Sequence, residues 1–211
     1  MTDSDESVSE DERTDPAPEG DTHASDHDHD EHDHHEHDQH EHEGHEHSHH
    51  EHDLETLGIA ILTVSSTRTR EEDTAGDTIV AILEGEGHEI VTRDVVQDAY
   101  DSVQGTVDRF VNRSDVDAVV TTGGTGVTPD DVTVEAVEPL FEKELPGFGE
   151  LFRRLSYEEV GTRAIATRAT AGIADGVPVF CLPGSESAVR LGAEDIIAEV
   201  VGHLAGLARQ T

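Results

Sequence analysis

Short apolar runs alternate with segments of helical periodicity along most of this chain. The runs at 57–64, 88–96 and 117–122 are of the kind expected of buried strands. Between them, in 73–87 and 101–113, apolar residues recur at helical spacing. Strands that alternate with helices over short links form a parallel sheet with helices on its faces. This order predicts an α/β domain with a mostly parallel central sheet.

The pattern of helices and strands continues to the end of the chain. Three further helices are expected, at 131–141, 146–161 and 186–207. The segments 164–176 and 177–184 are expected to be extended. The folded domain is then predicted to span 54–211, and about 155 residues are enough to form a hydrophobic core.

Residues 1–53 differ sharply from the rest, because Val8, Ala17 and Ala24 are nearly their only apolar side chains. Such a segment cannot bury enough surface to offset the entropy of ordering it, so we expect an acidic, disordered tail. Fourteen of the sixteen histidines lie within 23–52, interleaved with carboxylates.

Imidazole and carboxylate together suit Zn²⁺, Ni²⁺ or Cu²⁺, and we expect this tail to bind such a metal, more weakly at acidic pH. The alternative is a solvated polyanionic tail without a ligand. The histidines chosen as candidate ligands are His27, His29, His32, His34, His35 and His37.

Acidic residues dominate the folded part as well as the tail. The chain carries a net charge of −36, and 54–211 holds 28 acidic against 12 basic residues. Such a surface repels nucleic acid and anionic membranes, so neither is expected as a partner. Lys143 is the only lysine. Acid-rich and lysine-poor composition suggests adaptation to high salt, where charge repulsion is screened; an ordinary acidic protein is the alternative.

Sequence features that would place the chain outside the cytoplasm are missing. Cys181 is the only cysteine, so no intrachain disulfide can form, and it is expected to be a buried core thiol. No apolar run reaches 18 residues, and the N-terminus lacks the basic and apolar regions of a signal peptide. We therefore expect a cytoplasmic protein without membrane spans.

Three loops rich in glycine or hydroxyl groups follow predicted strands, at 65–76, 121–126 and 182–187. In open α/β sheets, ligands bind outside the carboxyl ends of strands. In TTGGTG at 121–126, glycine lets the backbone approach a ligand, and exposed N–H groups can bind phosphate oxygens. Neither the lysine-containing phosphate loop nor the GxGxxG fingerprint is present. A tight strand–helix connection is the alternative interpretation.

Aspartates accompany this glycine loop. Asp130 and Asp131 follow it directly, and Asp98 comes after the second predicted strand. A carboxylate beside bound phosphates would repel them unless Mg²⁺ lay between the two, since Mg²⁺ takes one or two carboxylates plus phosphate oxygens. Alternatively, these aspartates cap the helices that follow them.

Several ordered motifs at compatible spacing give the chain a family resemblance from about residue 57 to 207. TTGGTGVTPDDVTVEAV, ELPGFGELFRRLS, RATAGI and LPGSESAV resemble the MoaB/MogA family of molybdenum cofactor biosynthesis proteins, as does DTAG at 73–76. The resemblance implies a three-layer α/β/α fold, assembled as a homotrimer or a hexamer. It also implies transfer of AMP from Mg-ATP to molybdopterin, ahead of metal insertion by a separate insertase.

The resemblance also assigns roles to residues by motif. Asp131, which would hold Mg²⁺, matches the essential aspartate of the family, and Asp98 matches a second functional aspartate. Residues expected to contact the nucleotide and its phosphates are Gly123, Gly124, Thr125, Gly126 and Ser65. Residues expected near the pterin and its phosphate are Pro183, Gly184, Ser185, Arg168 and Arg190.

One departure from the family pattern concerns charge. The family commonly has a basic residue shortly after LPGS or LPGN, where this chain has Glu186 and Ser187. The lost positive charge would weaken binding of a pterin phosphate, and Arg190 or Arg168 is the expected compensation.

Two functions are therefore expected of this sequence. The first is Mg-ATP-dependent adenylylation of molybdopterin, with Asp131 and Asp98 as catalytic residues. The alternative is a non-catalytic molybdopterin-binding protein whose His-rich tail binds or delivers a transition metal.

Overall fold

A computed structural model describes residues 53–67 and 69–210 of the chain. The predictions for the tail, including its disorder and its six candidate histidine ligands, lie outside these residues. The elements in chain order are β1 Gly58–Val64, η1 Arg70–Glu72, α1 Thr74–Gly85, β2 Glu89–Val96, α2 Tyr100–Val111, β3 Ala118–Thr122, α3 Thr133–Val137, η2 Glu138–Leu140, β4 Lys143–Glu144, α4 Pro146–Val160, η3 Gly161–Ala166, β5 Thr170–Ala174, β6 Val177–Leu182, α5 Glu186–Gly192, η4 Ala193–Ile197 and α6 Ala198–Ala208.

Six strands form one sheet in the order β2-β1-β3-β6-β5-β4. The first four of these strands are parallel, whereas β5 runs antiparallel to β6 and β4 antiparallel to β5. The chain leaves β1 for β2 on one side and then crosses to β3 on the other side. The predicted α/β class with a mostly parallel sheet is thereby confirmed. Among the described residues, no helix is both long and apolar enough to span a membrane.

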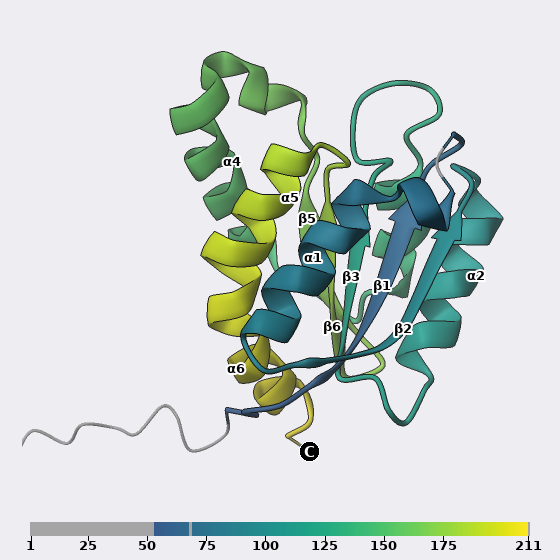
Figure 1. The fold of residues 1–211 in the computed structure, drawn as a ribbon, viewed down its shortest axis with the longest axis vertical. Coiled ribbons are helices and arrows are strands. Elements are labelled where there is room, and N and C mark those ends of the chain that lie inside the picture. The colour runs from purple at the N-terminus through teal and green to yellow at the C-terminus, as the bar shows by residue number, and fades with distance from the viewer. Residues whose placement is uncertain (1–52, 68, 211) are drawn as a thin grey trace, which may run out of the picture. The chain divides into compact units, whose positions relative to one another are not determined.

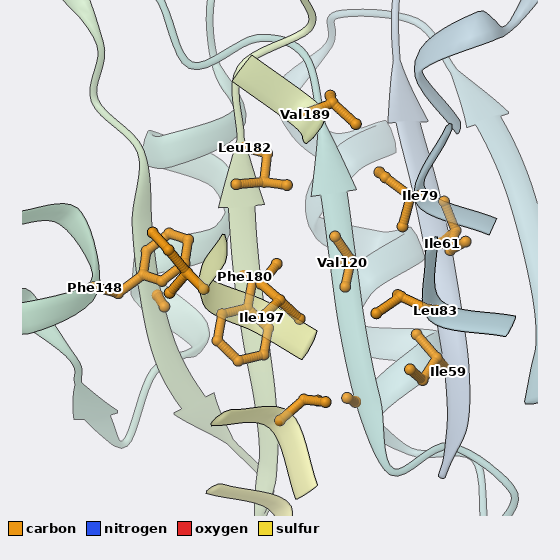
Figure 2. Close-up of a cluster of buried hydrophobic side chains, with 14 of the residues drawn as sticks. Ile59, Ile61, Ile79, Leu83, Val120, Phe148, Phe180, Leu182, Val189 and Ile197 are labelled. Carbon is orange, nitrogen blue, oxygen red and sulfur yellow. The ribbon is translucent and has the colours of Figure 1, made fainter. Parts of the chain in front are cut away.

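Helices cover both faces of this sheet, as Figure 1 shows. Alternate residues of a strand point to opposite faces, so each buried strand supplies two cores. In β1, Ile59 and Ile61 pack with side chains of α1, α4, α5 and α6 on one face. Figure 2 shows this cluster between the strands and these helices.

The second core lies on the opposite face of the sheet. Ala60 and Leu62 of β1 pack there against the apolar faces of α2 and α3. Cys181 of β6 belongs to this core, where burial raises the pKa of its thiol to about 12. The expectation of a buried core thiol is confirmed. With two helical layers around one sheet, the fold is the predicted three-layer α/β/α arrangement.

Three local predictions need correction, and one short strand was not predicted. The helix expected over 131–141 is only α3 followed by the turn η2, because Pro139 has no N–H to continue an α-helical ladder. The extended segment expected from 164 begins instead in η3, because Gly161 ends α4 with φ +63 and turns the chain. The terminal helix contains the π-helical stretch η4. Strand β4 was missed, since two residues show no alternation.

A buried carboxylate joins the first two strands to the first helix. Asp73 is fully buried before α1, where it accepts hydrogen bonds from the Thr63 hydroxyl at 2.5 Å and the Gly76 N–H at 3.0 Å. Arg93 of β2 pairs with the same carboxylate at 2.7 Å. Burial by itself raises the pKa of Asp73, but the hydrogen bonds from Thr63, Arg93 and Gly76 outweigh it and lower that pKa below its ordinary value.

This network predicts a pH-dependent contribution to stability. Because the folded pKa of Asp73 is depressed, its stabilising effect is complete above 3.8, the ordinary value, and is lost as the pH falls further through the folded pKa. Asp73→Asn should lower the free energy of unfolding by about 3 kcal/mol at neutral pH, since one partner of a buried pair is removed. Urea unfolding in molar KCl, repeated down to acidic pH, measures the difference.

Asp77→Asn is the matched control for this prediction. Asp77 also pairs with Arg93, at 2.6 Å, but its side chain is 64% exposed. An exposed pair contributes less than about 1 kcal/mol. Equal losses in the two variants, or a loss at Asp73 that does not shrink in acid, would contradict a buried, ionised Asp73.

Candidate functional site

The carboxyl ends of three parallel strands meet at Gly123, directly after β3. Its N–H donates to the Leu182 carbonyl at the end of β6, at 3.0 Å. Gly123 has φ +95, and a Cβ there would collide with the Val64 carbonyl at the end of β1. A Cβ on Gly184 would lie 3.2 Å from the Gly123 Cα. Only glycine allows this convergence, and the three loops therefore begin at one edge of the sheet.

The loop that follows β3 rises above the arrowheads of β1 and β3 in Figure 1. Its backbone carbonyls accept hydrogen bonds from Thr133 and Arg168. The Gly123 and Gly124 carbonyls accept from the Thr133 hydroxyl at 2.8 Å and its N–H at 2.9 Å. The Thr125 and Gly126 carbonyls accept from the Arg168 N–H at 3.1 Å and its Nε at 2.7 Å. The N–H groups of Gly124 and Thr125 donate no hydrogen bond to any residue that the structure describes. These two donors are therefore available to a ligand.

The Thr125 side chain adds a third unpaired donor. Thr125 is 1% exposed, and its hydroxyl has no hydrogen-bond partner among the described residues. Buried polar atoms in folded proteins are nearly always paired, so an orphaned hydroxyl requires an explanation. Thr125 lines the cavity described below, and a bound acceptor there would supply the missing partner.

Asp131 lies at the end of the same loop and also lines the cavity. Its Oδ2 accepts hydrogen bonds from the Thr128 hydroxyl at 2.6 Å and the Thr128 N–H at 2.8 Å. A Cβ on Gly126 would lie 2.7 Å from the same oxygen. Burial alone raises the pKa of Asp131, but the Thr128 and Gly126 hydrogen bonds outweigh it and lower that pKa below its ordinary value. The carboxylate is therefore ionised at neutral pH.

Ser65 follows β1 and Asp98 follows β2, and neither residue lines the cavity. Asp98 accepts a hydrogen bond from Ser66 at 3.0 Å, and a Cβ on Gly124 would lie 3.2 Å from its Oδ1. The alternative that the aspartates cap helices is wrong. The cap residues of α2 and α3 are Ala99 and Val132, which make no side-chain cap hydrogen bonds.

A cavity of about 350 Å³ opens between two of the three loops and the end of α4. Seven of the predicted residues line it together: Gly124, Thr125, Gly126, Asp131, Pro183, Gly184 and Ser185. The far wall comes from α4 and η3 and includes Ser156, Glu159 and Arg163, which were not predicted. Strand-end loops have a recognisable composition, but nothing in the sequence indicates that α4 folds back over them. The only signal in the sequence that could have pointed to this wall was Arg163 itself, because arginines are few in so acidic a chain.

Neither of the two predicted anion-binding arginines lines this cavity. Arg168 uses its guanidinium to hold the loop, donating to the Gly126 carbonyl at 2.7 Å, the Asp131 carbonyl at 3.0 Å and the Glu135 carboxylate. Arg190 is exposed on α5, 3.9 Å from both Glu186 and Glu194. Ser187, by contrast, does line the cavity.

The residues present fit Mg²⁺ only together with a ligand. No group of three or more histidine, cysteine or carboxylate side chains in the described part is placed to hold a metal ion. Mg²⁺ requires less than that, because it binds through one or two carboxylates plus substrate phosphates and water. The ionised Asp131 could supply one such carboxylate, and the free N–H groups beside it could bind the phosphate whose oxygens would complete the coordination.

Comparison with known proteins gives a consistent assignment. The family described as "Probable molybdopterin binding domain" matches residues 60–203. Molybdenum cofactor biosynthesis protein B of Halalkalibacterium halodurans is 43% identical over 151 residues, which cover 71% of this chain and 89% of that protein.

Solved structures agree with this match. A crystal structure of molybdenum cofactor biosynthesis protein B has a TM-score of 0.72 at 40% identity and covers 75% of this chain and 100% of its own. The tungsten cofactor synthesizing protein MoaB from Pyrococcus furiosus has a TM-score of 0.68 at 42% identity, with coverage of 74% and 99%. The chain therefore belongs to the MoaB/MogA family of molybdopterin-binding domains.

Proposed function

We propose that this protein acts in molybdenum cofactor biosynthesis by transferring AMP from Mg-ATP to molybdopterin. The names of the relatives support the pathway, since they are biosynthesis proteins for molybdenum or tungsten cofactors. One observation carries the proposal: the unused hydrogen-bond donors of Gly124 and Thr125 and the ionised carboxylate of Asp131 line the same cavity. Donors suit phosphate oxygens, and a carboxylate suits the cation that accompanies them.

The proposed reaction is a displacement at phosphorus. An oxygen of the terminal phosphate of molybdopterin attacks the α-phosphorus of ATP, and a new phosphoanhydride bond forms. The bond between that phosphorus and the bridging oxygen to the β-phosphate breaks, and pyrophosphate leaves with the electron pair. Mg²⁺, when bound, neutralises charge on the phosphates.

The chain's own residues contribute by positioning and by hydrogen bonding. The N–H groups of Gly124 and Thr125 and the Thr125 hydroxyl donate to phosphate oxygens, and they are fixed before the ligand arrives because their loop is held by Thr133 and Arg168. Fixed donors stabilise developing charge without reorganising during the reaction. Asp131 is the residue that would hold the magnesium.

The second loop of the cavity is the proposed pterin side. Pro183, Gly184 and Ser185 line the same cavity as the glycine loop, which would bring the pterin phosphate beside the nucleotide. Asp98, at the other end of the glycine loop, is proposed as the second functional carboxylate. A homotrimeric or hexameric assembly and delivery of the product to a molybdenum insertase complete the proposal.

Asp131→Asn tests the proposed role of the carboxylate. Loss of a metal-holding charge should lower AMP transfer by about 100-fold or more while molybdopterin still binds. The assay incubates the protein with molybdopterin and Mg-ATP in molar KCl and detects the adenylylated product by mass spectrometry.

Asp130→Asn is the matched control, because it removes the same charge from the exposed neighbouring position. It should transfer AMP at nearly the wild-type rate. Near-normal transfer by Asp131→Asn would eliminate the metal-holding role, and absence of product from the wild-type protein would eliminate the transferase.

The histidines of the tail favour a second candidate function, binding or delivery of a transition metal by a molybdopterin-binding protein. Replacing the six candidate histidines, His27, His29, His32, His34, His35 and His37, by asparagine keeps the tail length and its carboxylates. The variant should bind fewer Zn²⁺ or Ni²⁺ ions at neutral pH, as measured by calorimetry of the full chain.

The same variant separates the two candidate functions. Unchanged AMP transfer would make the tail an accessory to the enzyme. Unchanged metal binding would show that these six histidines are not the ligands, contrary to the prediction.

A further inference from the structure

The charges around the cavity do not favour the ligand proposed for it. Three charged side chains line it, Asp131, Glu159 and Arg163. Two of these are carboxylates, which repel a phosphate ligand at short range, and the protein as a whole carries a net charge of −36. A phosphate can enter only if positive charge or oriented donors outweigh this repulsion. Arg163 is the one positively charged side chain of the lining.

The fold places Arg163 at this position through a glycine. Helix α4 ends at Val160, and Gly161, with φ +63, turns the chain into η3. The buried Ala164 anchors that turn against the domain. Arg163, one residue earlier, stays exposed at the cavity. It forms no hydrogen bond or ion pair with any residue of the described ranges. All five N–H donors of its guanidinium are thus available for a phosphate.

The other arginines near the site are engaged elsewhere. The guanidinium of Arg168 is hydrogen bonded to the Gly126 and Asp131 carbonyls and to Glu135. Arg190 lies between Glu186 and Glu194 on the surface of its helix. Releasing either from these partners would cost interactions that Arg163 does not have to break.

We infer that Arg163 binds a phosphate group of the ligand in this cavity and sets its affinity for phosphate. The inference rests on the proposed function only in requiring a phosphate-bearing ligand. That phosphate belongs either to the nucleotide or to molybdopterin. The unpaired Thr125 hydroxyl on the opposing loop identifies the same space as a binding site independently of Arg163.

Binding, rather than turnover, tests this inference. Dissociation constants for Mg-ATP and, anaerobically, for molybdopterin are measured separately by calorimetry of the full chain in molar KCl. Arg163→Gln should weaken at least one of them by about 10-fold, the loss expected for a hydrogen-bonded charge. The weakened compound identifies which phosphate Arg163 holds. Arg154→Gln, an exposed arginine of α4 outside the cavity lining, should bind both compounds as the wild type does.

Two further variants exclude a structural explanation. Arg163→Lys should recover part of the affinity, and Ser187→Lys in the Arg163→Gln background should recover it from the other wall of the cavity. Unchanged melting temperatures would confirm that folding is not affected.

Three results would overturn the inference. They are wild-type affinity of Arg163→Gln for both compounds, equal losses in the Arg154 variant, and absence of binding to either compound by the wild type. Intact binding without AMP transfer would instead remove the proposed function and leave the role of Arg163 standing.

Discussion

The close approach of three strand ends at Gly123 is the constraint on which the site depends. The Gly123 N–H is bonded to the end of β6, while a side chain at this position would collide with the end of β1. In the loop that begins there, every backbone carbonyl from Gly123 to Gly126 accepts a hydrogen bond from Thr133 or Arg168. A peptide unit whose carbonyl is held on one side presents its N–H on the other. The loop is therefore a rigid set of donors, held by two residues far apart in the sequence.

Arg168 shows how a predicted role and an observed position can differ. Its sequence context suggested an anion partner, but its guanidinium supports the loop and the backbone of Asp131. Through these bonds it positions both the donors of the loop and the proposed magnesium-holding carboxylate. The guanidinium of Arg168 would therefore act on a ligand through the groups that it positions, and not through a direct contact.

The strongly acidic composition makes the electrostatics of this site unusual. The protein carries a net charge of −36, and the ligands proposed for it are themselves polyanions. Backbone N–H groups meet part of this requirement, because they attract phosphate without adding a lysine to the surface. A single unpaired arginine, Arg163, adds charge inside the cavity. High salt, the condition that the acid-rich and lysine-poor composition predicts, would screen the remaining long-range repulsion between the protein and such ligands.

The sequence by itself determined the fold class and one half of the site. The alternation of apolar runs and helical segments predicted the parallel sheet. Loops rich in glycine or hydroxyl groups after predicted strands indicated a ligand site at the strand ends, where the structure places 124–126 and 183–185 along one cavity. Both follow from local patterns, since strand ends and turns carry recognisable residues. Only the tertiary structure decided the second half, because the position of Arg163 depends on the turn at Gly161 and on the packing of α4 over the sheet. Arg190, expected near the pterin phosphate, lies instead between Glu186 and Glu194 on the exposed surface of α5.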